Sequence, residues 1–481
     1  MSNLNNQVIK ATKWSSVTEI AAKLVAPIST VFLARLLTPD AFGVLVTAIM
    51  VISFAEIFTD AGFQKYLIQH KFDSEVSLYR STTVAFWSNL FLSLLIWIGI
   101  ICFAEDIAIL VGNPGRGDII AVSCFCIPLA AFSSIQMALY KRNLDFKTLF
   151  WVRIVGVLIP LVVTIPLAYF TRSYWALIIG MIALNLSNAI ILTVKSKWKP
   201  SLFYSFSLLK EMFSFTVWSM VEAVSIWMTG YVDIFIVGTM LNQHYLGIYR
   251  TSMSTVVQIM GLITAATTPV LFSSLSKLQD DDVQLKQMFF SFQKLIGLLV
   301  IPLGVGIYLF RDIITGILLG SQWGEAAHFI GLWGLTSSIT IVLAHYCSEV
   351  FRAKGKPKLS VLAQVLHMFF LIPVVLWTVN KGFDVLCDSR ALVRLTLVLI
   401  NIILLYKVIG ITLMQMLKNI IPSVISVVPM SIAVYLLIDV SANLFFQLSL
   451  ILIAVAVYCC VLLLFPKERN IVLNLKKYFK K

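Results

Sequence analysis

Long apolar stretches alternate with short polar connections along the whole chain, and this pattern decides the fold class before any motif is considered. Each stretch has about the 20 residues that a helix needs to cross the roughly 30 Å hydrocarbon core of a bilayer. The stretches lie at approximately 14–37, 41–65, 82–104, 118–140, 150–170, 174–194, 212–239, 246–273, 288–310, 327–351, 359–379, 391–407, 418–438 and 444–465. The pattern predicts an all-α, polytopic membrane protein with about 14 transmembrane helices.

The connection at 195–211 divides these helices into two lobes, because it is long and rich in lysine. An internal repeat supports the division. Trp14-Ser15-Ser16-Val17 corresponds to Trp218-Ser219-Met220-Val221, and Phe42-Gly43-Val44 corresponds to Leu246-Gly247-Ile248, each displaced by 204 residues. With six spans in each copy, both copies enter the membrane in the same sense. We expect an N-lobe at 1–194, a cytoplasmic linker at 195–211, a C-lobe at 212–407, and two further helices with a basic tail at 408–481.

Composition and charge agree with a membrane protein and assign its sides. Apolar residues make up 59% of the chain and charged residues 12%, which excludes a water-soluble fold. Connections on one side of the expected spans, together with both ends, hold 27 Lys and Arg, whereas the opposite connections hold five. The positive-inside rule therefore places both termini in the cytoplasm. The net charge of +14 indicates contact with anionic lipid headgroups rather than with nucleic acid.

Polar residues form one stripe on each of four otherwise apolar spans, the opening pair of each lobe. A charge at the bilayer centre is costly, so such residues should face the bundle interior or a wet cavity. The stripes, read at helical spacing, are Glu19, Lys23 and Thr30; Ser53, Glu56, Asp60 and Gln64; Trp218, Glu222, Thr229 and Asp233; and Arg250, Ser254, Gln258, Gly261 and Thr268. Together they predict a hydrated central cavity. A simpler alternative is that Glu19 and Lys23 neutralise each other as an i,i+4 pair and only join helices.

Specific runs of residues resemble a known family. The run from Ala34 to Gly43 (ARLLTPDAFG) resembles the opening of bacterial polysaccharide transporters of the O-antigen, colanic-acid and teichuronic-acid exporter type. The resemblance continues in the segments Phe58-Thr59-Asp60-Ala61-Gly62, Leu67-Ile68-Gln69, Asp233-Ile234-Phe235-Ile236-Val237-Gly238, Leu246-Gly247-Ile248-Tyr249 and Leu319-Gly320-Ser321-Gln322-Trp323. One departure is the connection from Asn380 to Arg390, which is polar here where the family has a short turn rich in Gly and Ala.

The resemblance implies a fold, a substrate and a location. Members of this superfamily, which includes multidrug exporters and the lipid II flippase, are V-shaped, two-lobed bundles that work by alternating access. The implied activity is that of a flippase in the bacterial inner membrane, which moves an undecaprenyl-diphosphate-linked oligosaccharide from the cytoplasmic to the outer leaflet for lipopolysaccharide or other surface polysaccharide. A polysaccharide polymerase and other assembly machinery are candidate partners.

Within this hypothesis the candidate residues receive roles. Lys23 and Arg250 would pair with the diphosphate, and Gln64, Gln258, Thr229 and Trp218 would take sugars by hydrogen bonding and stacking. Arg35 near the outer end of the first span is a substrate contact, an interfacial anchor or a structural partner for Asp40. The carboxylates are helix contacts, H⁺ or Na⁺ sites, or acceptors for sugar hydroxyls; the residues do not separate these roles.

Two alternatives belong to other function classes. A cation-coupled exporter of drugs or other small molecules would share the fold but would favour a more acidic cavity. A membrane enzyme of glycan assembly would need a catalytic motif, and the lone His345 in an apolar span is better explained as a satisfied polar contact or a proton-sensitive cavity group. No Walker motif supports the direct use of ATP, and no Cys or His spacing indicates a metal site. We therefore expect a non-enzymatic transporter without a cofactor, in which coupling to H⁺ or Na⁺ stays open.

Overall fold

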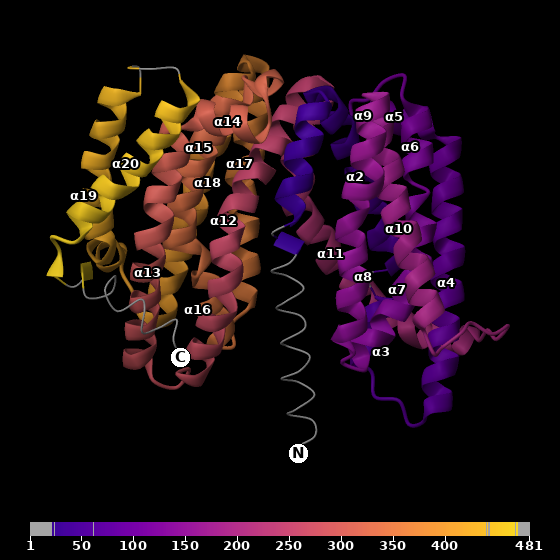
Figure 1. The fold of residues 1–481 in the computed structure, drawn as a ribbon. Helices are drawn as coiled ribbons and strands as arrows, with labels where there is room; N and C mark the ends of the chain where they lie inside the picture. The colour runs from indigo at the N-terminus through magenta and orange to yellow at the C-terminus, as the bar shows by residue number, and fades with distance from the viewer. Residues whose placement is uncertain are drawn as a thin grey trace. The chain divides into compact units, whose positions relative to one another are not determined.

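The computed structural model describes residues 22–23, 25–60, 62–438, 440, 443–466 and 468–469, with the backbone alone at 60, 213–219, 221, 222 and 444. Every regular element within these residues is a helix (Figure 1). Among them, 13 helical segments are long and apolar enough to cross a membrane, and a shorter apolar helix, Val25–Leu36, occupies the described part of the first expected span. The prediction of an all-α polytopic membrane protein is therefore confirmed.

The chain folds as two compact units, Met1–Arg250 and Thr251–Lys481, and each is described by itself. The first contains α2 (Pro39–Asp60), α3 (Phe63–Gln69), α4 (Glu75–Cys102), α5 (Ala104–Leu110), α6 (Gly117–Ser123), α7 (Cys126–Arg142), α8 (Phe146–Ile159), the π-helix η1 (Pro160–Thr164), α9 (Ile165–Thr171), α10 (Trp175–Lys195), α11 (Phe206–Met240) and the start of α12 (Gln243–Lys277).

The second unit contains the remainder of α12 and the following helices. These are α13 (Asp282–Leu309), α14 (Arg311–Leu318), the 3-10 helix η2 (Ser321–Trp323), α15 (Ala326–Thr340), the π-helix η3 (Ile341–His345), α16 (Cys347–Ala353), α17 (Lys358–Thr378), the 3-10 helix η4 (Val379–Lys381), α18 (Phe383–Ile409), α19 (Leu413–Leu437) and α20 (Leu444–Leu462). The boundary between the two units lies inside α12. The division into lobes at 1–194 and 212–407, which was expected from the sequence, stays a prediction.

Local sequence signals explain where several helices begin and end. Asp281 accepts hydrogen bonds from the backbone of Val283 and Gln284 and so caps α13. Thr412 and Gln415 form a reciprocal capping box at the start of α19. Before α19, the chain leaves α18 at Gly410, whose φ of 67° is in the left-handed region that glycine adopts without strain.

In the first unit, α7 packs against α2, α3, α4 and α10, and α11 packs against α2, α3 and α4. A cluster of buried residues that includes Leu67, Phe86 and Ile135 joins α3, α4 and α7. The start of α11 is tied to this cluster by a hydrogen bond of 2.8 Å from Tyr66 Oη to Glu211 Oε1. Burial, with the Glu211 hydrogen bond, raises the pKa of the Tyr66 hydroxyl, so this side chain stays a donor.

The N-terminal ends of α2 and α12 cross at two glycines. A Cβ placed on Gly43 would lie 2.0 Å from the backbone oxygen of Gln243, and a Cβ placed on Gly247 would lie 1.9 Å from the backbone oxygen of Pro39. Only residues without a Cβ allow two helices to approach this closely. The crossing residues correspond to each other in the 204-residue repeat, because Pro39 matches Gln243 and Gly43 matches Gly247.

Three connections expected on the cytoplasmic side lie together at one end of the first unit. Arg142 donates to the backbone oxygens of Leu67 and His70, at 2.6 and 2.9 Å, which joins the α7–α8 connection to the one that follows α3. Tyr79 Oη, on α4, donates to the backbone oxygen of Lys199 at 2.9 Å. The connections at 65–81, 140–153 and 195–210 are therefore neighbours, as alternating spans require.

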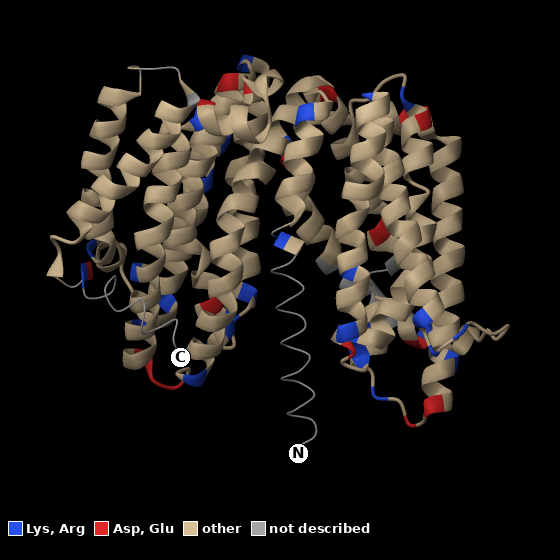
Figure 2. Cartoon of the chain, in the orientation of Figure 1, with Lys and Arg blue, Asp and Glu red and all other residues tan. Residues whose placement is uncertain are grey.

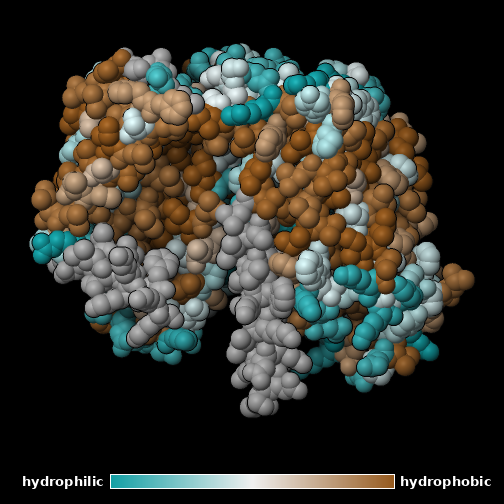
Figure 3. Space-filling view, viewed as in Figure 1, coloured by the Kyte–Doolittle hydropathy of each residue, from teal (hydrophilic) through white to brown (hydrophobic). Residues whose placement is uncertain are grey.

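In the second unit, α13 packs against α15 and α19, and α15 packs against α18. The last two spans are joined to α13 by a buried cluster that contains Val434 and Leu450, and by a 2.9 Å hydrogen bond from Tyr458 Oη to the backbone oxygen of Leu298. Lys354 forms a 2.5 Å ion pair with Asp282 and joins two connections expected in the cytoplasm. The surface facing the viewer in Figure 3 shows hydrophobic side chains around the helices and hydrophilic ones toward their ends.

Two boundaries differ from the sequence expectation. The second expected span, 41–65, ends earlier, because α2 stops at Asp60 and Gln64 belongs to the separate helix α3. The polar connection expected to run to Arg390 ends at Gly382, and α18 begins at Phe383. Its polar residues are accommodated by contacts with α15: Asp388 lies 2.7 Å from His328 Nε2, and the Arg390 guanidinium lies 5.0 Å from the Trp333 ring centroid.

Candidate functional site

The candidate residues of the first span lie at the edge of the described chain. Glu19 falls outside the described residues, so its pairing with Lys23 stays a prediction. Lys23 is half-buried, and Arg35, near the end of the helix Val25–Leu36, is exposed. The candidate roles of both cations also stay predictions.

Asp233 on α11 is held by a defined partner. Its side chain is buried and accepts a hydrogen bond of 2.9 Å from Tyr249 Oη, which lies on α12 and is fully buried. A carboxylate inside a spanning segment requires such a partner, because hydrocarbon offers it none. This hydrogen bond joins α11 to α12, which is one of the roles that the sequence left open for the carboxylates.

Arg250, the residue after Tyr249, lies beside three aromatic rings, which we call the aromatic ladder: Tyr231, Trp227 and Phe54. Its guanidinium carbon lies 6.0 Å from the Tyr231 ring centroid. Tyr231 stacks on Trp227 with 5.3 Å between centroids and 19° between planes, and Trp227 lies 4.8 Å from Phe54 of α2. Trp227 Nε1 also donates to Ser53 Oγ at 3.0 Å. The ladder thus runs from a cation on α12 across α11 to a hydroxyl on α2.

The other candidates are placed less completely. Glu56 on α2 and Thr229 on α11 are half-buried in the first unit, and Gln258, on the part of α12 in the second unit, is half-buried as well. Asp60 and Glu222 belong to α2 and α11, but their side chains are outside the described atoms. Gln64 is half-buried and belongs to the separate helix α3 rather than to α2, and its place on one face with Ser53 and Glu56 stays a prediction.

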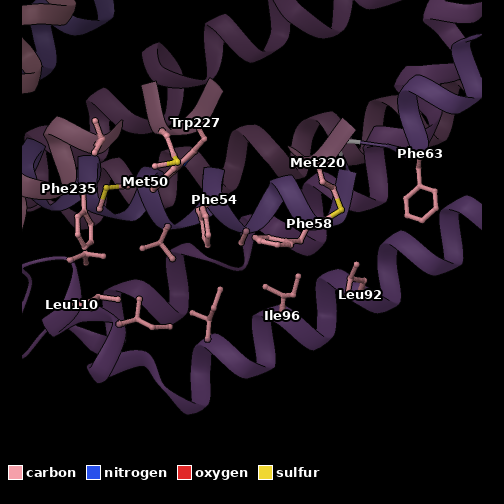
Figure 4. A pocket seen from close by; sticks show the side chains of 17 residues that line it. Met50, Phe54, Phe58, Phe63, Leu92, Ile96, Leu110, Met220, Trp227 and Phe235 are labelled. Carbon is pink, nitrogen blue, oxygen red and sulfur yellow. The ribbon is translucent and has the colours of Figure 1, made fainter. Parts of the chain in front are cut away.

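A cavity of about 910 Å³ lies in the first unit between α2, α4, α5 and α11, with Phe63 of α3 at one end (Figure 4). All the described side chains that line it are apolar. They include Phe54, Leu92, Ile96, Met220 and Trp227, which project toward the cavity from α2, α4 and α11. The cavity volume is in the range of about 300–1,000 Å³ found for ligand pockets.

Sequence reasoning missed the aromatic ladder and the cavity. Trp227 and Tyr231 are separated by four residues on one helix, a spacing that places them on the same face, so the ladder had a readable signal. The cavity had none, because apolar residues that line it have the same sequence pattern as residues that face lipid.

Charged side chains gather near the ends of the helices within each unit, and few lie at mid-length (Figure 2). Long apolar helices, with a cation, a buried carboxylate and an aromatic ladder among them, define a multi-pass membrane protein. Residues 32–328 match the family described as "Polysaccharide biosynthesis protein". Because this match covers more than half of the chain, the chain belongs to that family, and the resemblance noted in the sequence is confirmed.

Named relatives agree with this assignment, and a solved structure shares the fold. The lipopolysaccharide biosynthesis protein WzxC of Escherichia coli K12 is 21% identical over 78% of this chain and 75% of its own length. The teichuronic acid biosynthesis protein TuaB of Bacillus subtilis is 20% identical over 75% of this chain and 74% of its own length. The fold is similar to that of the lipid II flippase MurJ in an inward closed conformation, with a TM-score of 0.73, 15% identity, and coverage of 95% of this chain and 99% of MurJ.

Proposed function

We propose that this protein is a flippase that moves an undecaprenyl-diphosphate-linked oligosaccharide from the cytoplasmic to the outer leaflet by alternating access. The observation that carries the proposal is Arg250 at the end of the aromatic ladder, on helices of a family named for polysaccharide biosynthesis. The names of the relatives, which refer to lipopolysaccharide and teichuronic acid, support a glycan substrate.

The chemistry of the substrate explains what the protein has to provide. A diphosphate-sugar headgroup cannot enter hydrocarbon, because its charges and hydroxyls would lose their hydrogen bonds to water. Arg250 offers a planar guanidinium that binds phosphate oxygens in pairs. Tyr231 of the aromatic ladder, which lies beside Arg250, and Thr229 nearby in sequence on α11 offer a ring face and a hydroxyl to sugars. The protein therefore has to supply only a path for the head, while the polyprenyl chain stays in an apolar environment. No cofactor is part of this proposal.

The test uses a strain that lacks the protein and measures the amount and sidedness of the lipid-linked oligosaccharide. Membranes are treated with a sugar-modifying enzyme that cannot cross them, and the lipids are identified by mass spectrometry. We expect complete repeat units to accumulate on the cytoplasmic side, and expression of the wild-type protein to clear them. Units that already face outward would indicate a later enzymatic step. An unchanged pool would indicate an exporter of other small molecules.

Variants in the same strain test the diphosphate contact. Arg250→Ala and Lys23→Ala should fail to clear the accumulated lipid at normal protein levels, and Arg250→Lys should clear it partially, because lysine keeps the charge without the bidentate geometry. Arg153→Ala is the matched control, since Arg153 is an exposed arginine on α8 of the same unit. Normal export by both alanine variants at Arg250 and Lys23 would refute the diphosphate contact.

A further inference from the structure

The apolar cavity of the first unit is long. Along α11 it extends from Met220 to Phe235, and fifteen residue steps at 1.5 Å correspond to about 22 Å. The cavity, with a volume of about 910 Å³, is therefore long enough to hold an extended stretch of a flexible chain.

The lining restricts the chemistry of that chain. The described side chains around the cavity carry no ionisable group, and the one that has a polar atom, Trp227, directs its Nε1 to Ser53 Oγ. A sugar or phosphate inside would find no described hydrogen-bond partner and would lose its hydration. A hydrocarbon chain keeps an apolar environment on entry, because the cavity lining is as apolar as the lipid tails it replaces.

Trp227 connects the cavity to the charged end of the site. One indole lines the cavity and also stacks on Tyr231, whose ring lies beside the Arg250 guanidinium. An anionic group and an apolar chain can therefore be accommodated next to each other in one unit of the protein. The arrangement of a cation, two stacked rings and an apolar cavity therefore suits a molecule with an anionic head and a long hydrocarbon tail.

We propose that the cavity holds the polyprenyl chain of the transported lipid while its diphosphate lies at Arg250. This inference rests on the proposed function and adds a second subsite to it. Because a chain leaves an apolar bilayer for an equally apolar cavity, the gain in free energy is small, and selection comes from the length of chain that the cavity holds. The chain can then leave the cavity as readily as it enters, which turnover requires.

The test is photolabelling of the full-length protein in nanodiscs of phosphatidylcholine and phosphatidylglycerol. One probe is a polyprenyl phosphate with a diazirine near the end of its chain, and the other is phosphatidylglycerol with the same group in an acyl chain. Labelled peptides are identified by mass spectrometry. We expect the polyprenyl probe to label the lining segments of α4, from Leu92 to Ile100, and of α11, from Met220 to Phe235, in preference to the phospholipid probe.

Two tryptophan substitutions on α4 provide the matched comparison. Leu92→Trp adds bulk inside the cavity, whereas Leu94→Trp adds it at an exposed position outside the lining. Leu92→Trp should reduce labelling by the polyprenyl probe roughly tenfold, which corresponds to about 1.4 kcal/mol in binding free energy. Leu94→Trp should leave the labelling unchanged.

Three results would overturn the inference. The first is equal labelling of the lining segments by both probes, which would assign the cavity to bilayer lipid. The second is an absence of labelling of these segments by the polyprenyl probe. The third is equal labelling of the Leu92→Trp and Leu94→Trp variants by the polyprenyl probe. The wild-type protein is tested in parallel for clearance of the accumulated lipid in the deletion strain. Clearance without labelling of the cavity would reject this subsite alone, and failure of clearance would reject the proposed function.

Discussion

Replacement of either crossing glycine by alanine should destabilise the first unit through a backbone collision. In Gly43→Ala the new methyl group would lie 2.0 Å from the backbone oxygen of Gln243, whereas ordinary contacts of a Cβ begin at 3.4 Å. The helices α2 and α12 would have to separate by about 1.4 Å at this point, the difference between these two distances. No side-chain rotation relieves the contact, because the obstacle is a carbonyl group of the main chain.

The size of the effect follows from this geometry. Overpacking of a close-packed core costs about 1–3 kcal/mol and occasionally more, and a backbone obstacle places Gly43→Ala near about 3 kcal/mol. Gly247→Ala should behave alike, because its Cβ would lie 1.9 Å from the backbone oxygen of Pro39. One separation of the helices relieves both collisions. The double variant should therefore cost clearly less than the sum of the two single variants.

The assay is thermal unfolding of the purified proteins in one detergent, with the shift in Tm as the measurement. Gly99→Ala is the control, because no described atom lies within 4 Å of the added methyl group on α4, and alanine is a better helix former than glycine by about 1 kcal/mol. Gly99→Ala should keep or raise the Tm. Equal Tm values for Gly43→Ala and Gly99→Ala, or additive shifts in the double variant, would refute the close crossing.

Two further predictions concern the second unit. Backbone hydrogen bonds from Gln284 and Val283 hold the pKa of Asp281 below its ordinary value near 3.8, so the cap should stabilise α13 above about pH 4 and lose its effect as the pH falls through the folded-state pKa. The difference in Tm between wild type and Asp281→Ala should be constant above that pH and should shrink below it; a difference that grows on acidification would contradict this. Lys294 forms a 2.5 Å ion pair with the buried Glu468, and Lys294→Met should destabilise the protein by about 3–5 kcal/mol, because it leaves a buried carboxylate unpaired. Adding Glu468→Leu should recover much of the lost Tm, and no recovery would show that the pair is not the cause.

The sequence predicted the spans well because a bilayer imposes both a length and a composition on each helix. Its two boundary errors have physical causes. The pattern suggested one span through Gln64 because Phe58 and Phe63 continue the apolar character on either side of Asp60, whereas α2 ends at Asp60 and α3 begins at Phe63. The start of α18 was read as a connection because it contains Asp384 and Asp388, but Asp388 pairs with His328 and can therefore lie in a helix.

The sequence predicted those features of the candidate site that depend on the spacing of residues along one helix, and not those that depend on contacts between helices. Helical spacing identified Asp233 and Arg250 as polar positions on their spans, and the structure shows Asp233 bound to Tyr249 and Arg250 beside Tyr231. Which residue of α12 meets which residue of α11 depends on the register between helices. That register is set by packing between the two helices, and the sequence of one helix does not contain it.

The glycine crossing has the geometry of a symmetric dimer contained within one chain. Residue 39 of one repeat touches residue 247, and residue 43 touches residue 243, so each contact has a counterpart displaced by 204 residues, as in an isologous interface. Asp40 lies against its own counterpart, His244, at 3.3 Å. In a homodimer this axial position would bring two identical side chains together, and two aspartates there would repel each other. Because the two repeats belong to one chain, each can carry a different residue at this position. The chain can therefore place an acid opposite a base, which a strictly symmetric homodimer cannot do on its two-fold axis.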